Sequence, residues 1–264
     1  MTLPARPVGQ TSVVRLNAYE WGDSSGPPVV CLHGVTGHGA RFAELATRLP
    51  AFRVVGVDLR GHGYSGSEPP WSIVTQLADL AETAAALGIA RAAWVGHSFG
   101  GRLVAELSSR APDLIERAVL LDPAMHIPPA TAYLQAEALR PDTSFASLDE
   151  AIDARLTDGT LFSTPLATLE AEVDAHFDQG DDGRWRARFS RVAAIVAWSE
   201  MSAGSPPYPA QPTLVVLGER SWIANEVPAQ PNVEVVSVPG GHSVLWDDFD
   251  ETAAAVSAFV SKEQ

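Results

Sequence analysis

One serine in the chain is placed as a catalytic nucleophile would be. Ser98 lies in the segment WVGHSFGG at residues 94–101, with Gly96 two positions before it and Gly100 two positions after it. A serine hydroxyl is a weak nucleophile until a base takes its proton, so an enzyme that uses it must hold it in place. Glycine on both sides permits a very tight turn, because it removes the side chains that would collide there. We therefore predict that Ser98 is a nucleophile on a strained turn.

The base that such a serine needs has a candidate near the end of the chain. His242 lies in the segment GGHS at residues 240–243, after an apolar run typical of a strand. A loop at that point could place the imidazole over Ser98, where it could accept the serine proton. Two earlier segments also end apolar runs, HGV at residues 33–35 and DLRGHGYS at residues 58–65. A backbone N–H from the first of them could donate to a developing oxyanion.

Short runs of β-branched residues alternate with amphipathic stretches, which is typical of βαβ units and a mainly parallel sheet. We expect strands at residues 13–19, on an antiparallel edge, and at residues 29–33, 53–58, 92–96, 117–122, 213–217 and 233–238. We expect helices at residues 40–49, 72–87, 98–110 and 250–262. Ser98 therefore falls where a strand ends and a helix begins, the context in which its motif indicates catalysis.

Residues 124–209 interrupt this alternation. They carry no strand signal, and their helical pieces are separated by proline and by glycine; the segment SPPYP at residues 205–209 closes them as a stiff linker. Helices inserted into an α/β array indicate a lid or cap over the site. We expect residues 124–209 to form this helical cap, and residues 1–123 and 210–264 to form the core.

Four motifs occur in the same order as in a known superfamily: HGV at residues 33–35, DLRGHGYS at 58–65, GHSFG at 96–100 and GGHS at 240–243. In these motifs the chain resembles the α/β-hydrolase fold superfamily, in its cap-bearing branch of serine hydrolases. The resemblance implies an α/β fold with a mostly parallel sheet of the eight-stranded type, flanked by helices. It also implies a helical cap inserted after strand six.

The resemblance assigns roles to individual residues. It implies that Ser98 is the nucleophile and His242 the general base. The oxyanion hole would consist of the backbone N–H groups of Val35 and Phe99. It implies no bound cofactor, and because no pair of histidines has metal-ligand spacing on one element we also expect no metal.

The acid of the triad departs from the commonest pattern. Many relatives carry it after the strand equivalent to residues 213–217, but this chain reads GERS there, with Ser221 in place of the aspartate. Other relatives carry it at the end of the preceding strand, where this chain has Asp122. Both strand ends open on the same edge of the sheet and could reach the imidazole. We favour Asp122, although it could simply cap a turn, and keep Glu219 as the alternative.

Four other histidines have less distinctive settings. His33 and His62 belong to the loop motifs, and we expect them to bind nearby backbone. His97, inside the serine turn, should point away from the Ser98 hydroxyl and pack. His126 lies at the root of the insertion, where it could either line the pocket or stay outside it.

The composition of the chain limits the classes of molecule that it is expected to bind. The chain has 18 Lys and Arg against 32 Asp and Glu, a net charge of −14, which disfavours nucleic acid and anionic membranes. Four arginines, Arg184, Arg186, Arg188 and Arg191, form a basic cluster that we expect on a solvated helix face, paired with carboxylates. The single cysteine, Cys31, excludes an internal disulfide. With no signal-like or membrane-spanning stretch, we expect a cytoplasmic protein whose partner is a small molecule.

These features together favour a hydrolase of carboxylic esters or lactones, acting on a small to medium, largely apolar substrate. An acyl-enzyme would form on Ser98, and His242 would pass the proton to the leaving alcohol. One alternative uses the same residues to cleave a C–C bond in a β-diketone-like substrate. Another is a ligand-binding protein that has the fold without the turnover.

Overall fold

A seven-stranded sheet forms the centre of the computed structural model, which describes residues 15–262. Its spatial order is β1-β3-β2-β4-β5-β8-β9, and every pairing is parallel except that of β1 with β3. The strands are β1 (Ala18–Gly22), β2 (Pro28–Leu32), β3 (Arg53–Val57), β4 (Ala92–His97), β5 (Ile115–Leu121), β8 (Thr213–Gly218) and β9 (Val233–Val238). The fold class predicted from the sequence is confirmed.

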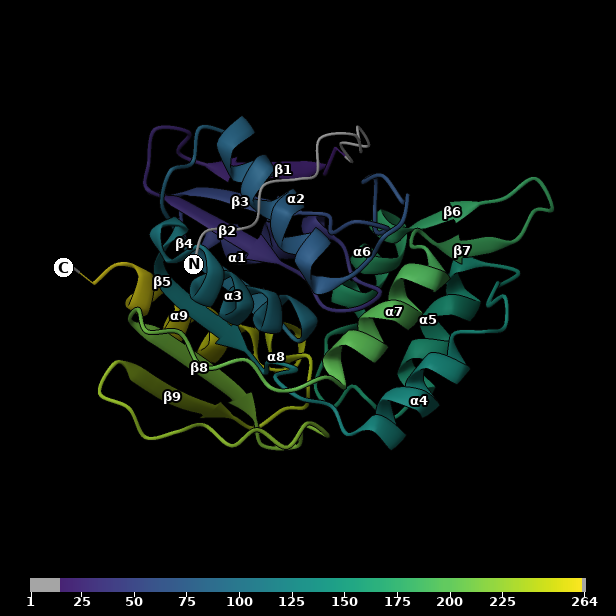
Figure 1. Cartoon of the computed structure of the whole chain (residues 1–264). Helices are drawn as coiled ribbons and strands as arrows, with labels where there is room; N and C mark the ends of the chain where they lie inside the picture. Colours follow the sequence, from purple (N-terminus) through teal and green to yellow (C-terminus); the bar gives the residue numbers. More distant parts are fainter. Residues whose placement is uncertain (1–14, 263–264) are drawn as a thin grey trace.

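Helices cover both faces of this sheet (Figure 1). One face packs on α2 (Ile73–Ala86) and α3 (Phe99–Arg110), the other on α1 (Ala43–Thr47) and α9 (Phe249–Val260). Successive residues of a strand point to opposite faces, so Val30 and Leu32 join the first core while Val29 and Cys31 join the second. The inner strands β2 and β4 are almost wholly buried and apolar because neither face meets water, whereas the edge strands β1 and β9 are partly exposed.

Several boundaries differ from those expected. The first described strand begins at Ala18, and the expected residues 13 and 14 lie outside the described part of the chain. The expected helix at residues 40–49 is a 3₁₀ turn, Gly39–Phe42, followed by the short α1. Ser72 caps α2 as expected, since its side chain accepts from the Thr75 backbone N–H. A second 3₁₀ turn (Pro112–Leu114) precedes β5, and a one-turn helix α8 (Val244–Asp247) precedes α9.

The insertion, residues 124–209, lies beyond the carboxyl ends of the parallel strands (Figure 1). It contains α4 (Pro129–Ala138), α5 (Leu148–Thr157), α6 (Leu166–His176) and α7 (Arg191–Met201). It also contains a hairpin of β6 (Phe177–Gln179) and β7 (Trp185–Ala187). We did not expect this hairpin, because strands of three residues are too short to show an alternating pattern in the sequence. We expected eight strands with the insertion after the sixth. Residues 15–262 show a seven-stranded sheet with the insertion after the fifth strand, which is one strand fewer in both respects.

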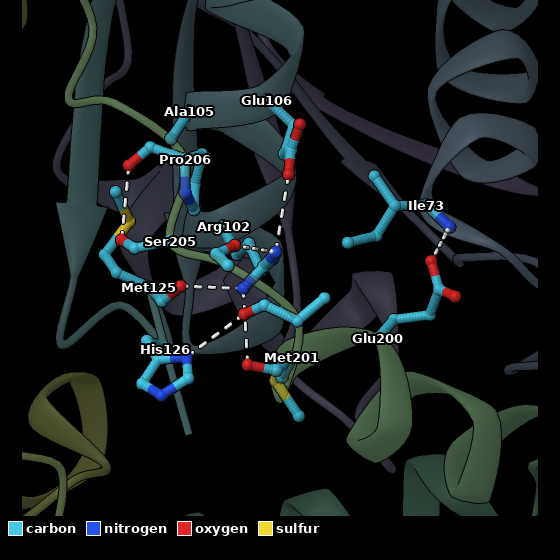
Figure 2. Close-up of polar contacts among 12 residues, drawn as sticks. Ile73, Arg102, Ala105, Glu106, Met125, His126, Glu200, Met201, Ser205 and Pro206 are labelled. Atoms are coloured by element: carbon cyan, nitrogen blue, oxygen red, sulfur yellow. Dashed lines mark hydrogen bonds and ion pairs between the residues drawn. The ribbon is translucent and has the colours of Figure 1, made fainter. Parts of the chain in front are cut away.

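One buried arginine ties both ends of the insertion to α3 (Figure 2). Arg102, one turn beyond Ser98, donates to the backbone carbonyls of Met125 at 2.7 Å, Met201 at 3.3 Å and Gly204 at 2.8 Å. Buried carbonyls need donors, and a guanidinium can supply several at once. The helix that follows Ser98 therefore holds the two points where the chain enters and leaves the insertion.

No helix within residues 15–262 has both the length and the apolar character that crossing a membrane requires.

Candidate active site

Ser98 occupies a strained turn between β4 and α3. Its backbone angles, φ 54° and ψ −117°, are unusual for a residue with a side chain. The turn brings its neighbours so close that a Cβ at Gly96 would lie 2.4 Å from the backbone of Gly100. A Cβ at Gly100 would lie 2.3 Å from the carbonyl oxygen of Leu32. Both glycines are therefore required by contact with backbone, as the sequence motif suggests.

The structure brings Ser98, His242 and Asp122 together. The distance from His242 Nε2 to Ser98 Oγ is 2.9 Å, and that from His242 Nδ1 to Asp122 Oδ2 is 2.6 Å. A carboxylate accepts, so Nδ1 carries the proton and Nε2 is free to accept the serine hydroxyl proton. Asp122 is 1% exposed and Ser98 6%, which keeps water from competing for these bonds.

Asp122 is held in place by β8 and the loop that follows it. It directly follows β5, with φ 40°, and its backbone N–H donates to the Val216 carbonyl on β8 at 2.7 Å. Its Oδ1 accepts from the Gly218 N–H at 3.3 Å, and its Oδ2 accepts from the Ser221 hydroxyl at 2.5 Å. Glu219, the alternative acid, is exposed and contributes only a backbone N–H to the Val238 carbonyl.

The loop that carries His242 is held by two carboxylates. The backbone N–H of Gly240 donates to Asp248 at 2.6 Å, and that of Gly241 donates to Asp247 at 2.8 Å. Both aspartates lie at or beside α8, just after the loop they bind. They therefore shape the turn that presents the imidazole and do not contact the imidazole nitrogens.

His97 does more than the packing expected from its sequence position. Its Nε2 donates to the backbone carbonyl of His242 at 2.9 Å, and the two ring centroids are 4.7 Å apart. Burial and the neighbouring His242 hold the pKa of His97 well below its usual value, so the ring is neutral. No sequence motif indicates this contact, because the two residues come from segments far apart in the chain.

The expected oxyanion donors lie beside Ser98. Phe99 is the first residue of α3, where backbone N–H groups have no partner inside the helix. Val35 follows Gly34 on the loop after β2, and a Cβ at Gly34 would lie 2.9 Å from Ser98 Cβ. Val35 and Ser98 both line the cavity described below, and the role of the Val35 and Phe99 N–H groups as oxyanion donors stays a prediction.

Two buried histidines hold the loop after β2. His33 Nδ1 donates to the Gly34 carbonyl at 2.7 Å and its Nε2 accepts from the Leu59 N–H at 3.0 Å. His62 Nε2 accepts from the Thr36 N–H at 3.3 Å. Burial lowers the pKa of His62 to about 4 and that of His33 well below its usual value, which keeps both rings neutral acceptors. They bind backbone, as their motif position led us to expect.

A cavity of about 650 Å³ opens over Ser98 and His242. Its walls combine the loop after β2 with α4, α5, α6 and α7 of the insertion. Trp198 and Trp222, whose ring centroids are 6.1 Å apart, line it beside His242. His126 does not line it: this side chain is exposed and donates to the Ala203 carbonyl at 3.0 Å.

The comparisons with known proteins agree with this geometry. The family model described as alpha/beta hydrolase fold matches residues 27–249. The chain belongs to this family. The alpha/beta hydrolase is 29% identical over 254 residues to lipase LipV of Mycobacterium tuberculosis, covering 92% of this chain and 97% of that one.

One further relative and one solved structure are both named as hydrolases of 2-(acetamidomethylene)succinate. The alpha/beta hydrolase is 28% identical to the 2-(acetamidomethylene)succinate hydrolase of Mesorhizobium japonicum, over 94% of this chain and 92% of that one. The crystal structure of an E-2-(acetamidomethylene)succinate hydrolase superposes with a TM-score of 0.81 at 23% identity, over 95% and 97% of the two chains. At that identity the superposition shows the fold.

Of the four arginines in the basic cluster of this alpha/beta hydrolase, three lie on the hairpin or just after it, and only Arg191 lies on a helix, as the first residue of α7. Arg186 bonds to Asp142 and Asp182, and Arg188 bonds to Asp178, so the expected pairing with carboxylates is present. Arg186 and the neighbouring Ala187 of β7 both line the cavity. Within the described chain, no group of three or more His, Cys, Asp or Glu side chains is placed to hold a metal ion.

Proposed function

We propose that the protein is a serine hydrolase that cleaves a carboxylic ester or lactone through an acyl-enzyme on Ser98. The observation that supports this most directly is the continuous hydrogen-bonded chain from Ser98 Oγ through His242 to Asp122. Such a chain gives the hydroxyl a base and gives the base a fixed tautomer.

In the proposed reaction the Ser98 oxygen attacks the carbonyl carbon while its proton passes to His242 Nε2. The N–H groups of Val35 and Phe99 stabilise the oxyanion of the tetrahedral intermediate. His242 then donates the proton to the leaving alcohol oxygen, the C–O bond breaks and the acyl group stays on Ser98. Water, deprotonated by His242, then attacks the acyl carbon; the bond from that carbon to Ser98 Oγ breaks, His242 returns the proton to Ser98 Oγ, and the acid is released. Asp122 stabilises the imidazolium in both halves of the reaction.

We also propose that residues 124–209 act as the substrate-selecting cap on a core of residues 1–123 and 210–264. The support is that the cavity over Ser98 is walled by helices of the insertion. Trp198 of the insertion and Trp222 of the core provide an apolar surface beside His242, suited to an apolar part of the substrate.

The two alternatives fare differently against this geometry. A ligand-binding protein without turnover drew its support from the uncertain acid, and the contact between Asp122 and His242 removes that support. Cleavage of a C–C bond uses the same three residues, so the substrate decides between it and ester hydrolysis. No separate feature of the cavity favours it.

A fluorophosphonate probe tests the proposal, because it reacts covalently with activated serines. We expect labelling of the wild-type protein at Ser98 and none in Ser98→Ala. A panel of 4-nitrophenyl esters, lactones and β-diketones then identifies the bond cleaved. Folded wild-type protein that neither reacts with the probe nor turns over any ester or lactone would refute the proposed function.

A further inference from the structure

The wall of the cavity carries more positive charge than the acidic chain as a whole would suggest. Against a net charge of −14, the cavity is lined by Arg41, Arg155, Arg186 and Arg191 but only by Asp142 and Glu172 among acidic residues. Three of these arginines engage at least two nitrogens each; Arg191, for example, donates from Nη1 to the Arg140 carbonyl at 2.8 Å, and its Nη2 lies 4.0 Å from Asp142. Arg186 uses Nε, Nη1 and Nη2 in bonds to Asp142 and Asp182.

Arg41 is also neutralised. It reaches the cavity from the 3₁₀ turn before α1, and its Nε and Nη2 both donate to Glu172 on α6. His38 donates to the same carboxylate at 2.8 Å, and the guanidinium lies over the Trp246 ring at 4.5 Å from its centroid. Burial raises the pKa of the Glu172 carboxyl, but the charge of Arg41 and the hydrogen bonds from His38 and Arg41 outweigh this effect and hold that pKa well below its usual range. Glu172 therefore stays ionised and balances Arg41.

Arg155 is different, because only one of its nitrogens is engaged. It extends from α5 of the insertion, and its Nη1 bonds to Asp158 and lies 3.5 Å from Thr160 Oγ1. Its Nε and Nη2 donate no hydrogen bond within residues 15–262. These two nitrogens form one edge of a planar fork, the edge that matches the two oxygens of a carboxylate.

Arg155 is one of the residues that line the cavity over Ser98. The side chain is 39% exposed, yet burial lowers the pKa of its guanidinium and the nearby charge of Arg41 lowers it further, while Asp158 opposes both. Arg155 therefore lines the cavity from a position that is partly shielded from water. Anions bind guanidinium groups more strongly there than in open solvent.

We infer that Arg155 binds a carboxylate of the substrate, at a point of the substrate separate from the bond that Ser98 attacks. This inference rests on the proposed function and narrows it to monoesters or lactones that carry a free carboxylate. The apolar part of such a substrate would lie between the tryptophans and Arg155. Losing a charge-assisted pair of this kind weakens binding by about 10- to 100-fold.

Binding can be measured without turnover in the Ser98→Ala background. The ligands are the 4-nitrophenyl half-esters of adipic, pimelic and suberic acid. Each is paired with the corresponding methyl 4-nitrophenyl diester, in which a neutral methyl ester replaces the free carboxylate. By isothermal titration calorimetry we expect at least one half-ester to bind about 10-fold or more tightly than its diester. In Ser98→Ala/Arg155→Gln that preference should disappear, with the affinity for the diester unchanged within about twofold.

Arg140→Gln in the same background is the matched control. Arg140 lies in the same insertion, pairs with Glu137 on the surface and does not line the cavity, so the preference should survive its loss. Equal affinity for half-ester and diester in Ser98→Ala would overturn the inference, as would a preference that persists without Arg155. Neither result depends on catalysis, so both stay distinct from failure of the probe to label Ser98.

Discussion

The Ser221 hydroxyl donates to Asp122 Oδ2 at 2.5 Å, on the same carboxylate oxygen that accepts from His242. Ser221 occupies the position where many relatives carry the triad acid. In this chain that position holds a neutral donor, and the carboxylate comes from the neighbouring strand. Asp122 follows β5 and Ser221 follows β8, and these two strands are neighbours in the sheet. A carboxylate at either strand end could therefore reach His242. In this chain Asp122 is that carboxylate, and Ser221 donates a hydrogen bond to it.

Exchanging the two candidate acids for amides tests this arrangement. Asp122→Asn should lower kcat by about ten-thousand-fold, because an amide cannot hold the imidazole in the required tautomer. Glu219→Gln should leave kcat unchanged, since Glu219 is exposed. Steady-state kinetics on the best ester from the panel measures both. A near-normal Asp122→Asn enzyme beside an inactive Glu219→Gln enzyme would contradict the assignment.

Ser221→Ala should lower kcat by about 10-fold with little change in KM. The variant removes one hydrogen bond to the ionised Asp122 and leaves substrate contacts in place. Ser221→Thr keeps a hydroxyl at the same position and serves as the control, with most of the activity retained. If Ser221→Ala and the wild type have equal kcat, the serine has no supporting role.

His97→Phe should lower kcat by about 10- to 100-fold while KM changes little. The carbonyl of His242 would lose its donor, and a small displacement of the base is costly in rate. His97→Gln, whose amide can donate from the place of Nε2, should recover most of the loss. His126→Phe removes a comparable bond to a carbonyl outside the cavity and should behave as wild type. Equal loss in the Phe and Gln variants would argue against the hydrogen bond.

Arg102→Met should reduce the free energy of unfolding by about 3 kcal/mol, because three backbone carbonyls at the ends of the insertion lose a buried donor. Urea unfolding followed by circular dichroism measures this. Arg110→Met is the matched control: Arg110 also pairs with Glu106, but at the surface, and its loss should cost less than about 1 kcal/mol. Equal destabilisation in the two variants would be inconsistent with anchoring.

The stability of the protein should fall in acid, in part because of His176. Burial, with a smaller contribution from the nearby His38, lowers the pKa of His176 from its usual value of 6.5 to about 3. Between these values the unfolded chain binds a proton that the folded chain does not, so the free energy of unfolding falls as the pH falls. One such group contributes a slope of up to about 1.4 kcal/mol per pH unit.

His176→Gln removes the titrating group and can keep the donor to the Thr36 carbonyl. Urea unfolding at a series of pH values should therefore show a smaller slope between about pH 6 and pH 4 in the variant, by about that amount. The remaining buried histidines, His33, His62 and His97, should still make the variant lose stability in acid. Parallel curves for the two proteins would show that His176 does not titrate in this way.

The sequence by itself determined the features that local chemistry controls. The alternation of apolar runs with amphipathic stretches predicts the parallel sheet, because a strand buried on both faces must be apolar throughout. The glycines around Ser98 predict the tight turn, because any Cβ there meets backbone. The short strands β6 and β7 could not be predicted in this way, because each contains too few residues to show a periodic pattern.

Only the tertiary structure decided which distant side chains meet. Asp122 and Glu219 follow neighbouring strands, and their order along the chain does not say which carboxylate turns toward His242; the 2.6 Å contact with Asp122 does. The bond from His97 to His242 and the open edge of Arg155 likewise depend on loops and helices packed together from separate segments. Such contacts leave no motif, because hydrogen bonding is set by three-dimensional position and not by spacing along the chain.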